Sequence, residues 1–118
     1  MGRRSRRRGE QRIHAPNAEY VDAEGNTLTL RGSLSAGARA KYESERTGHP
    51  LSADDARERA FELLFEQLAV GWTIAGEPLV DQRELLGRLR LASREEREWV
   101  RGRLREHCAE RFPDVQVD

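Results

Sequence analysis

The sequence predicts an α+β fold, mainly α, in which an N-terminal β-hairpin precedes a cluster of three to four short helices. Three observations predict it: one alternating apolar pattern near the N-terminus, repeated helix-capping signals after it, and a highly charged composition. Hydrophobic residues make up 36% of the 118 residues and charged residues another 36%. We therefore expect a modest core and short amphipathic helices with ionic outer faces.

The hairpin is predicted from two short runs, residues 19–22 and 27–31. In the second run Leu28 and Leu30 alternate with threonine and arginine, which is the period of a half-buried strand. Between the runs, Gly25-Asn26 supplies the residue types that accept a positive φ in a tight turn. These features favour two antiparallel strands joined by a short turn.

Two helices are expected next. Ser35 can cap a short helix over residues 36–43, which ends before Gly48-His49-Pro50. Ser52, followed three residues later by Asp55, resembles a capping box and opens a longer helix. At spacings of three and four, the apolar stripe of that helix comprises Ala60, Phe61, Leu64, Phe65, Leu68 and Trp72.

This stripe predicts that the helix continues to Gly71, with Trp72 at its exit. Residues 72–80 are then interpreted as a packed corner with a Gly-x-Pro turn. Asp81 and Ser93 each precede an acidic residue by three positions, so each is expected to cap a further helix. The last helix presents on one side Trp99, Val100, Leu104, His107 and Cys108, and it closes at Phe112-Pro113.

The charge is unevenly distributed although the formal net charge is zero. Residues 1–16 have no apolar periodicity, and we interpret them as a basic arm that is disordered in isolation. Residues 17–118 are expected to form a single small hairpin-plus-helices domain with a net negative charge. The arm contains six arginines: Arg3, Arg4, Arg6, Arg7, Arg8 and Arg12.

Nothing in the chain predicts catalysis, a cofactor or a metal. His107 and Cys108 are adjacent, and neighbouring helix residues point about 100° apart, which is poor geometry for shared ligation. The paired acids at 54–55 and 95–96 fall in first helical turns, where capping explains them. No apolar run reaches the roughly 18 residues of a membrane span, and no apolar segment of a secretory signal follows the basic N-terminus. We therefore expect a cytoplasmic, non-enzymatic protein.

The order of these features resembles a known family. The strand 27–31 leads into Leu34-Ser35-Ala36-Gly37-Ala38-Arg39, a longer helix ends in Gly71-Trp72 and the turn 75–79, and two helices follow. From about Tyr20 to Leu104 the chain is similar to the small tail assembly proteins (tail assembly chaperones) of siphophages and prophages. The resemblance implies a protein without catalytic residues that binds a tape-measure or tail-tube protein in the bacterial host, or a component of the virion itself.

Four apolar residues are the predicted partner-binding positions: Phe65, Trp72, Leu89 and Trp99. We expect the apolar stripes to exceed what so small a body can hide, and we therefore also expect a homo-oligomer built on the helical half. The alternative function is a nucleic-acid-associated protein that contacts phosphates through the arginine arm. The residues leave both functions open.

If the arm is a separate phosphate-binding segment, its deletion should change nucleic-acid binding and leave the stability of the folded domain unchanged. Deleting residues 1–12 should leave the thermal midpoint within a few degrees, because the segment offers no apolar side chain beyond Met1 for a core. Any binding of DNA or RNA should disappear with the arm and should weaken steeply as salt rises. Thermal melting and fluorescence-anisotropy titrations measure both, and nucleic-acid affinity that survives the deletion would exclude the arm as its source.

Overall fold

A computed structural model describes residues 15–47 and 52–117 of the chain. Four strands and four helices are placed within these residues. In chain order they are β1 (Ala18–Val21), β2 (Thr27–Leu30), α2 (Ala36–Thr47), α3 (Ala53–Leu68), β3 (Ala69–Ile74), β4 (Glu77–Leu79), α4 (Gln82–Arg90) and α5 (Arg94–Arg111). The predicted α+β, mainly α class with an N-terminal hairpin is confirmed.

The first hairpin follows from its turn chemistry. Asp22 accepts hydrogen bonds at Oδ1 from the backbone N–H groups of Glu24 and Asn26, at 2.8 and 2.9 Å. Gly25 takes a φ of +86°, the left-handed conformation that glycine adopts without a steric penalty. Leu28 and Leu30 are fully buried while the threonines between them are half-buried, as the alternation predicts.

The capping predictions for the helices are also confirmed. The side chains of Ser52, Asp81 and Ser93 accept hydrogen bonds from backbone amides in the first turns of α3, α4 and α5. Ser93 and Glu96 form a complete reciprocal capping box. Because each cap satisfies an otherwise free N–H group, the start of each helix is fixed by local sequence.

One prediction is wrong: α3 does not reach Gly71, and the segment after it is not a corner. The helix ends at Leu68, and the chain continues directly into β3. Trp72 lies in that strand, opposite Leu28 of β2 and Leu79 of β4. Spacings of three and four carry the apolar stripe into the strand by coincidence, because pairing with β2 selects the conformation here.

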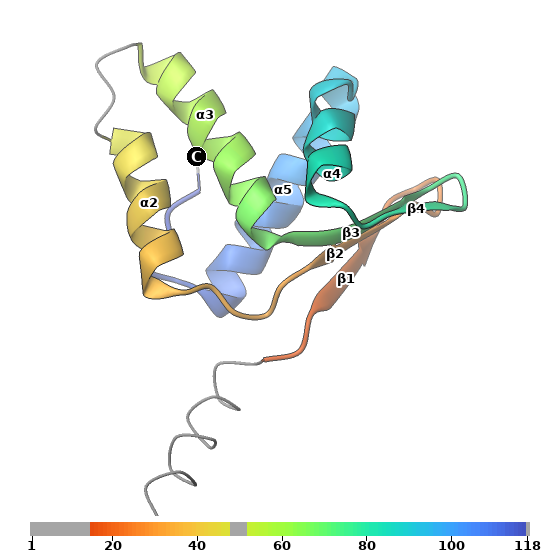
Figure 1. Ribbon diagram of the computed structural model, residues 1–118, viewed down its shortest axis with the longest axis horizontal. Helices are drawn as coiled ribbons and strands as arrows, with labels where there is room; N and C mark the ends of the chain where they lie inside the picture. Colours follow the sequence, from red (N-terminus) through yellow and green to blue (C-terminus); the bar gives the residue numbers. More distant parts are fainter. Residues whose placement is uncertain (1–14, 48–51, 118) are drawn as a thin grey trace, which may run out of the picture.

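The two hairpins join into one antiparallel sheet with the order β1-β2-β3-β4. β2 and β3 are the central pair although residues 31–68 separate them along the chain. A register shift between Thr29 and Leu30 leaves Val70 as the extra residue of a bulge. The hairpin turns lie side by side at one end of the sheet and project away from the helices (Figure 1), where the N–H of Ala75 donates to Asn26 Oδ1 at 3.0 Å.

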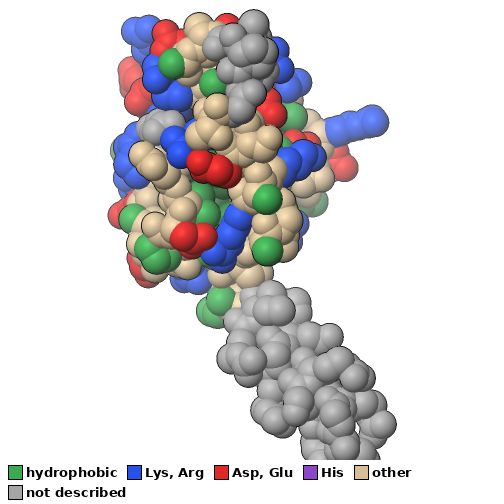
Figure 2. All heavy atoms as spheres, turned by 90° about the vertical axis from the view of Figure 1, so that its left-hand side faces the viewer, with side chains coloured by type: hydrophobic (Ala, Val, Ile, Leu, Met, Phe, Trp, Pro, Cys, Tyr) green, Lys and Arg blue, Asp and Glu red, His purple; other side chains and the backbone are tan. Residues whose placement is uncertain are grey.

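The helices cover one face of this sheet. α4 and α5 lie against the strands, α3 leads into β3, and α2 packs on the far side of α3 (Figure 1). On the side of α2 and α3, acidic and basic side chains are interspersed over the surface (Figure 2). Among the described residues, the covered face of the sheet and the inner faces of the helices form one hydrophobic core.

The core closes within a single chain. Phe65, Leu89 and Leu104 are fully buried, and Trp72 retains 3% exposure. The argument that the apolar stripes need a second copy to hide them is therefore wrong, since one chain buries them. Self-association remains a prediction, but it no longer follows from an incomplete core.

Trp72 joins the sheet to the helices, so its truncation should be costly. It contacts Phe65 edge-on at a centroid distance of 5.8 Å, and the Arg88 guanidinium lies over its ring at 5.3 Å. Trp72→Ala should destabilise the fold by about 3–5 kcal/mol through lost burial and a cavity. Chemical denaturation measures this loss of unfolding free energy. Trp99→Ala is the control at a partly buried position, and it should cost less. Equal losses for the two variants would contradict the view that Trp72 joins the sheet to the helices.

Candidate protein-interaction surface

The candidate surface is the face of the sheet that points away from the helices (Figure 1). Cross-strand pairing places its residues in two rows. One row consists of Val21, Thr27, Thr73 and Pro78, and the other of Glu19, Thr29 and Gly71. None of these residues belongs to the core, although alternate residues of the same strands do. An antiparallel sheet with one covered face and one open face has this pattern.

The open face differs in chemistry from the rest of the chain. Its threonines are half-buried, and at its borders Val21 and Val80 are 62% and 71% exposed. Residues 15–30 and 69–79 contain no arginine or lysine, in a protein with 21 basic residues. A nearly uncharged, partly apolar surface surrounded by ionic surface is typical of a protein-binding site.

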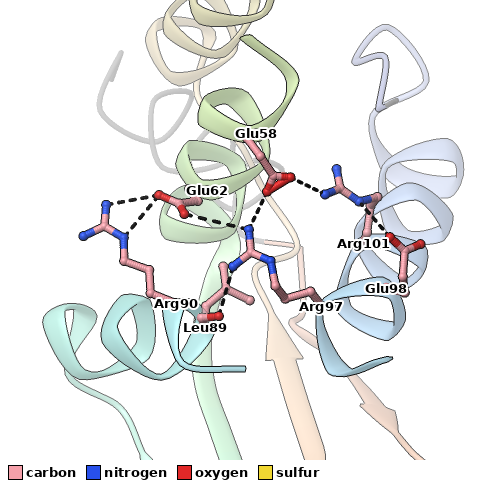
Figure 3. A network of polar contacts seen from close by, with 7 residues as sticks. All are labelled: Glu58, Glu62, Leu89, Arg90, Arg97, Glu98 and Arg101. Carbon is pink, nitrogen blue, oxygen red and sulfur yellow. Dashed lines mark hydrogen bonds and ion pairs between the residues drawn. The ribbon is translucent and has the colours of Figure 1, made fainter. Parts of the chain in front are cut away.

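Several arginines of the helices, by contrast, make contacts within the fold. Glu58 of α3 bonds to both Arg97 and Arg101 of α5, the latter at 2.7 Å (Figure 3). Glu62 of α3 is joined to Arg90 of α4 at 3.1 Å and lies 3.9 Å from Arg97. These contacts connect three helices around one cluster of opposite charges.

The same arginines cover an aromatic ring. The guanidinium groups of Arg97 and Arg101 lie 5.3 and 4.2 Å from the centroid of Phe61. Burial alone would raise the pKa of Glu58, but the hydrogen bonds from both arginines outweigh it and hold that pKa below its usual value. We interpret this cluster as a helix-to-helix contact rather than a binding site, because its charges compensate one another.

β1 is fixed to α5 by a buried histidine. The carbonyl of Arg31 can only accept, so His107 donates from Nε2 to it at 2.6 Å, and His107 Nδ1 then accepts from the Tyr20 hydroxyl at 2.8 Å. The His107 ring also contacts Tyr20 and Phe112 edge-on, each at 5.7 Å. His107 is fully buried. This residue holds the edge strand of the candidate surface in place.

The described residues contain no group of three or more histidine, cysteine, aspartate or glutamate side chains placed to hold a metal ion. Burial raises the pKa of the Cys108 thiol to about 12, so it carries no thiolate near neutral pH. A hollow of about 340 Å³ lies between α2 and the segment after α5. It is lined by Arg39, Ala40, Tyr42, Glu43, Arg46, Asp114, Val115 and Gln116. No nucleophile lies beside a base in this lining.

The predicted partner-binding residues do not come together on a surface. Phe65 and Leu89 are fully buried and Trp72 nearly so within the single chain, so they form no exposed surface there, and their assignment as partner-binding residues stays a prediction. Apolar periodicity predicts that a residue is buried, but it does not distinguish burial within its own chain from burial by a partner. Trp99 is only partly buried, on the face of α5 one turn before Arg103, and its assignment remains a prediction.

The alternative, nucleic-acid site concerns residues outside the described part of the chain. Arg3, Arg4, Arg6, Arg7, Arg8 and Arg12 all lie within residues 1–14, and the structure describes the chain from residue 15. Phosphate contact by the arm therefore remains a prediction.

The open sheet face was missed by sequence reasoning. Its signal in β2 was the alternation itself, in which Thr27 and Thr29 had to face away from the core. Thr73 and Pro78 carried no such signal, because the segment 69–79 was interpreted as a helix end and a corner. The face exists only once β3 is paired with β2.

Comparison of the chain with protein-family models, with curated proteins and with solved structures finds no match. In the described residues, no helix is both long enough and apolar enough to cross a bilayer.

The buried histidine predicts a pH dependence of stability. Burial lowers the pKa of His107 below its ordinary value of about 6.5, and the hydrogen bond to Arg31 opposes this shift only in part. A proton therefore binds the unfolded chain more readily than the folded chain. Stability should be complete above about pH 6.5 and should fall as the pH drops towards 5, by at most about 1.4 kcal/mol per pH unit.

Urea unfolding between pH 7 and pH 5 measures this slope. The lowered carboxyl pKa values of Asp22, Glu58 and Glu96 act at more acidic pH, so they do not interfere in this window. His107→Gln should remove the slope, whereas His49→Gln should keep it. An unchanged slope in His107→Gln would show that another group is responsible.

Proposed function

We propose that this chain is a non-catalytic protein that binds another protein through the open face of its four-stranded sheet. The chemistry of this face favours a binding role over an enzymatic one, because its two rows carry one charged residue, Glu19, and no catalytic grouping. The observation that carries the proposal is the pair of rows containing Thr27, Thr29 and Thr73, which the fold leaves outside the core.

The partner proposed is a tape-measure or tail-tube protein, and the process is phage or prophage tail assembly. This part rests on the resemblance from about Tyr20 to Leu104, including the Gly71-Trp72 pair and the turn that follows it. The geometry is compatible with that resemblance, since a protein that acts by contact needs a stable scaffold and one accessible surface. The strands supply the surface, and the covered side supplies the scaffold.

The test uses tape-measure and tail-tube proteins encoded beside this gene, purified and titrated against the intact chain by calorimetry. Thr29→Arg and Thr73→Arg each place a long charged side chain on the open face without changing the core. Each should weaken binding at least tenfold while the melting temperature stays close to that of the parent chain.

Thr47→Arg is the matched control. Thr47 is the exposed last residue of α2, on the opposite side of α3 from the strands, so this substitution should leave binding unchanged. Equal binding by the parent and both face variants would remove the sheet from the interface. Absence of binding to every neighbouring tail protein would refute the tail-assembly assignment.

A further inference from the structure

The open sheet also has an edge, and its geometry is more specific than that of the face. β1 is one of the two edge strands of the sheet. Four of its residues pair with β2, and no described strand lies on its other side. An edge strand with unpaired backbone groups is a template for a further strand.

The turn of the hairpin determines which groups point outward. The N–H of Asp22 donates to Asn26 O at 2.9 Å, so Asp22 faces β2. Hydrogen-bonding direction alternates along an antiparallel strand, so Ala18 and Tyr20 also face β2. Glu19 and Val21 therefore direct their N–H and C=O groups away from the sheet. The N–H and C=O groups of Glu19 and Val21 are therefore two donors and two acceptors on the free edge of β1, and they have the spacing that an added strand needs.

The other edge of the sheet is less suited to pairing. β4 has only three residues. A two-residue turn connects it to β3, so Ile74 and Glu77 form the hydrogen-bonded pair nearest that turn. The next residue, Pro78, is the one whose N–H would face outward, and proline has none. The asymmetry singles out β1.

The surroundings of β1 are acidic. Glu19 and Glu24 are exposed, and Asp22 lies between them in sequence. Burial raises the pKa of Tyr20, and the charges of Glu106 and Glu110 on α5 raise it further, which places both carboxylates near this edge. Two nearby arginines offset part of this charge: Arg103 lies 3.3 Å from Glu106, and Arg111 donates to Pro16 O at 2.9 Å, and both lower the pKa of Tyr20.

We propose that the free edge of β1 binds an extended segment of the partner protein as a fifth strand, and that this segment carries arginine or lysine at alternate positions. Backbone pairing with Glu19 and Val21 provides the register. Side chains of the added strand alternate between the two faces of the sheet, and Glu19 and Val21 share the open face. The basic side chains lie on that face beside Glu19, and the intervening apolar side chains lie on the covered side beside Tyr20. The inference rests on the proposed protein-binding function and names the chemistry of its partner.

The test uses the full-length protein and a blocked six-residue peptide of alternating arginine and valine. NMR amide hydrogen exchange is measured with and without the peptide. The amides of Glu19 and Val21 should become protected together, and binding should weaken when salt rises from about 50 to 300 mM. A peptide with glutamate in place of arginine is the matched control, and it should bind at least tenfold more weakly.

Two variants test the backbone and the charge separately. Val21→Pro removes an outward N–H that the sheet does not use, and it should weaken peptide binding at least fivefold, whereas Val21→Thr keeps the N–H and should bind like the parent. Glu19→Arg changes the charge without the backbone, and it should weaken binding by a similar factor. The Glu19→Arg variant also keeps the test decisive if Val21→Pro does not fold.

Three results would overturn the inference. The first is no binding of the arginine peptide, and the second is binding that leaves the exchange of Glu19 and Val21 unchanged. The third is that the amides of Glu19 and Val21 are already protected in the free protein, and that replacing the six arm arginines by glutamine removes this protection. That result would make the chain's own arm the occupant. If the tail protein's binding is abolished by Thr29→Arg but not by Glu19→Arg or Val21→Pro, the proposed function stands and this inference fails.

Discussion

The pairing of β2 with β3 is the interaction on which the rest of this structure depends. It brings Leu28 opposite Trp72 and joins two hairpins that are far apart in the sequence. Without it neither hairpin has enough apolar surface to be stable alone. Once it forms, Leu28, Leu30 and Trp72 present one continuous apolar face, and α3, α4 and α5 bury their stripes against it. The open face is the other side of the same pairing.

Local signals made much of this fold predictable. The turn at Gly25 and the caps at Ser52, Asp81 and Ser93 act over a few residues, so their positions could be derived from neighbouring side chains alone. The same reasoning failed after Leu68, where the conformation is decided by a strand about 40 residues earlier in the chain. A sequence window that contains only residues 61–80 holds no trace of that partner.

The candidate surface shows a related limit. Apolar periodicity marked Phe65, Trp72 and Leu89 as residues that need burial, and it could not distinguish burial by a partner from burial by α4 and the sheet. The candidate surface instead differs from the rest of the chain in composition, because its segments contain no arginine although the chain is rich in arginine. That absence is visible in residues 15–30 and 69–79, but it acquires a spatial meaning only when the two segments are placed side by side. The arginines have been concentrated on the helices, where Glu58, Glu62 and Phe61 engage them.

Pro78 has a consequence for how many copies of this protein can associate. If both sheet edges could accept strands, β1 of one molecule could pair with β4 of the next, and the contact would repeat into an open-ended fibre. A proline at the centre of β4 removes the donor that such a chain of molecules would need. Any pairing through β1 then ends after one addition. A free β1 edge opposite a proline-blocked β4 edge is therefore compatible with pairing to one further strand and not with a continuous filament.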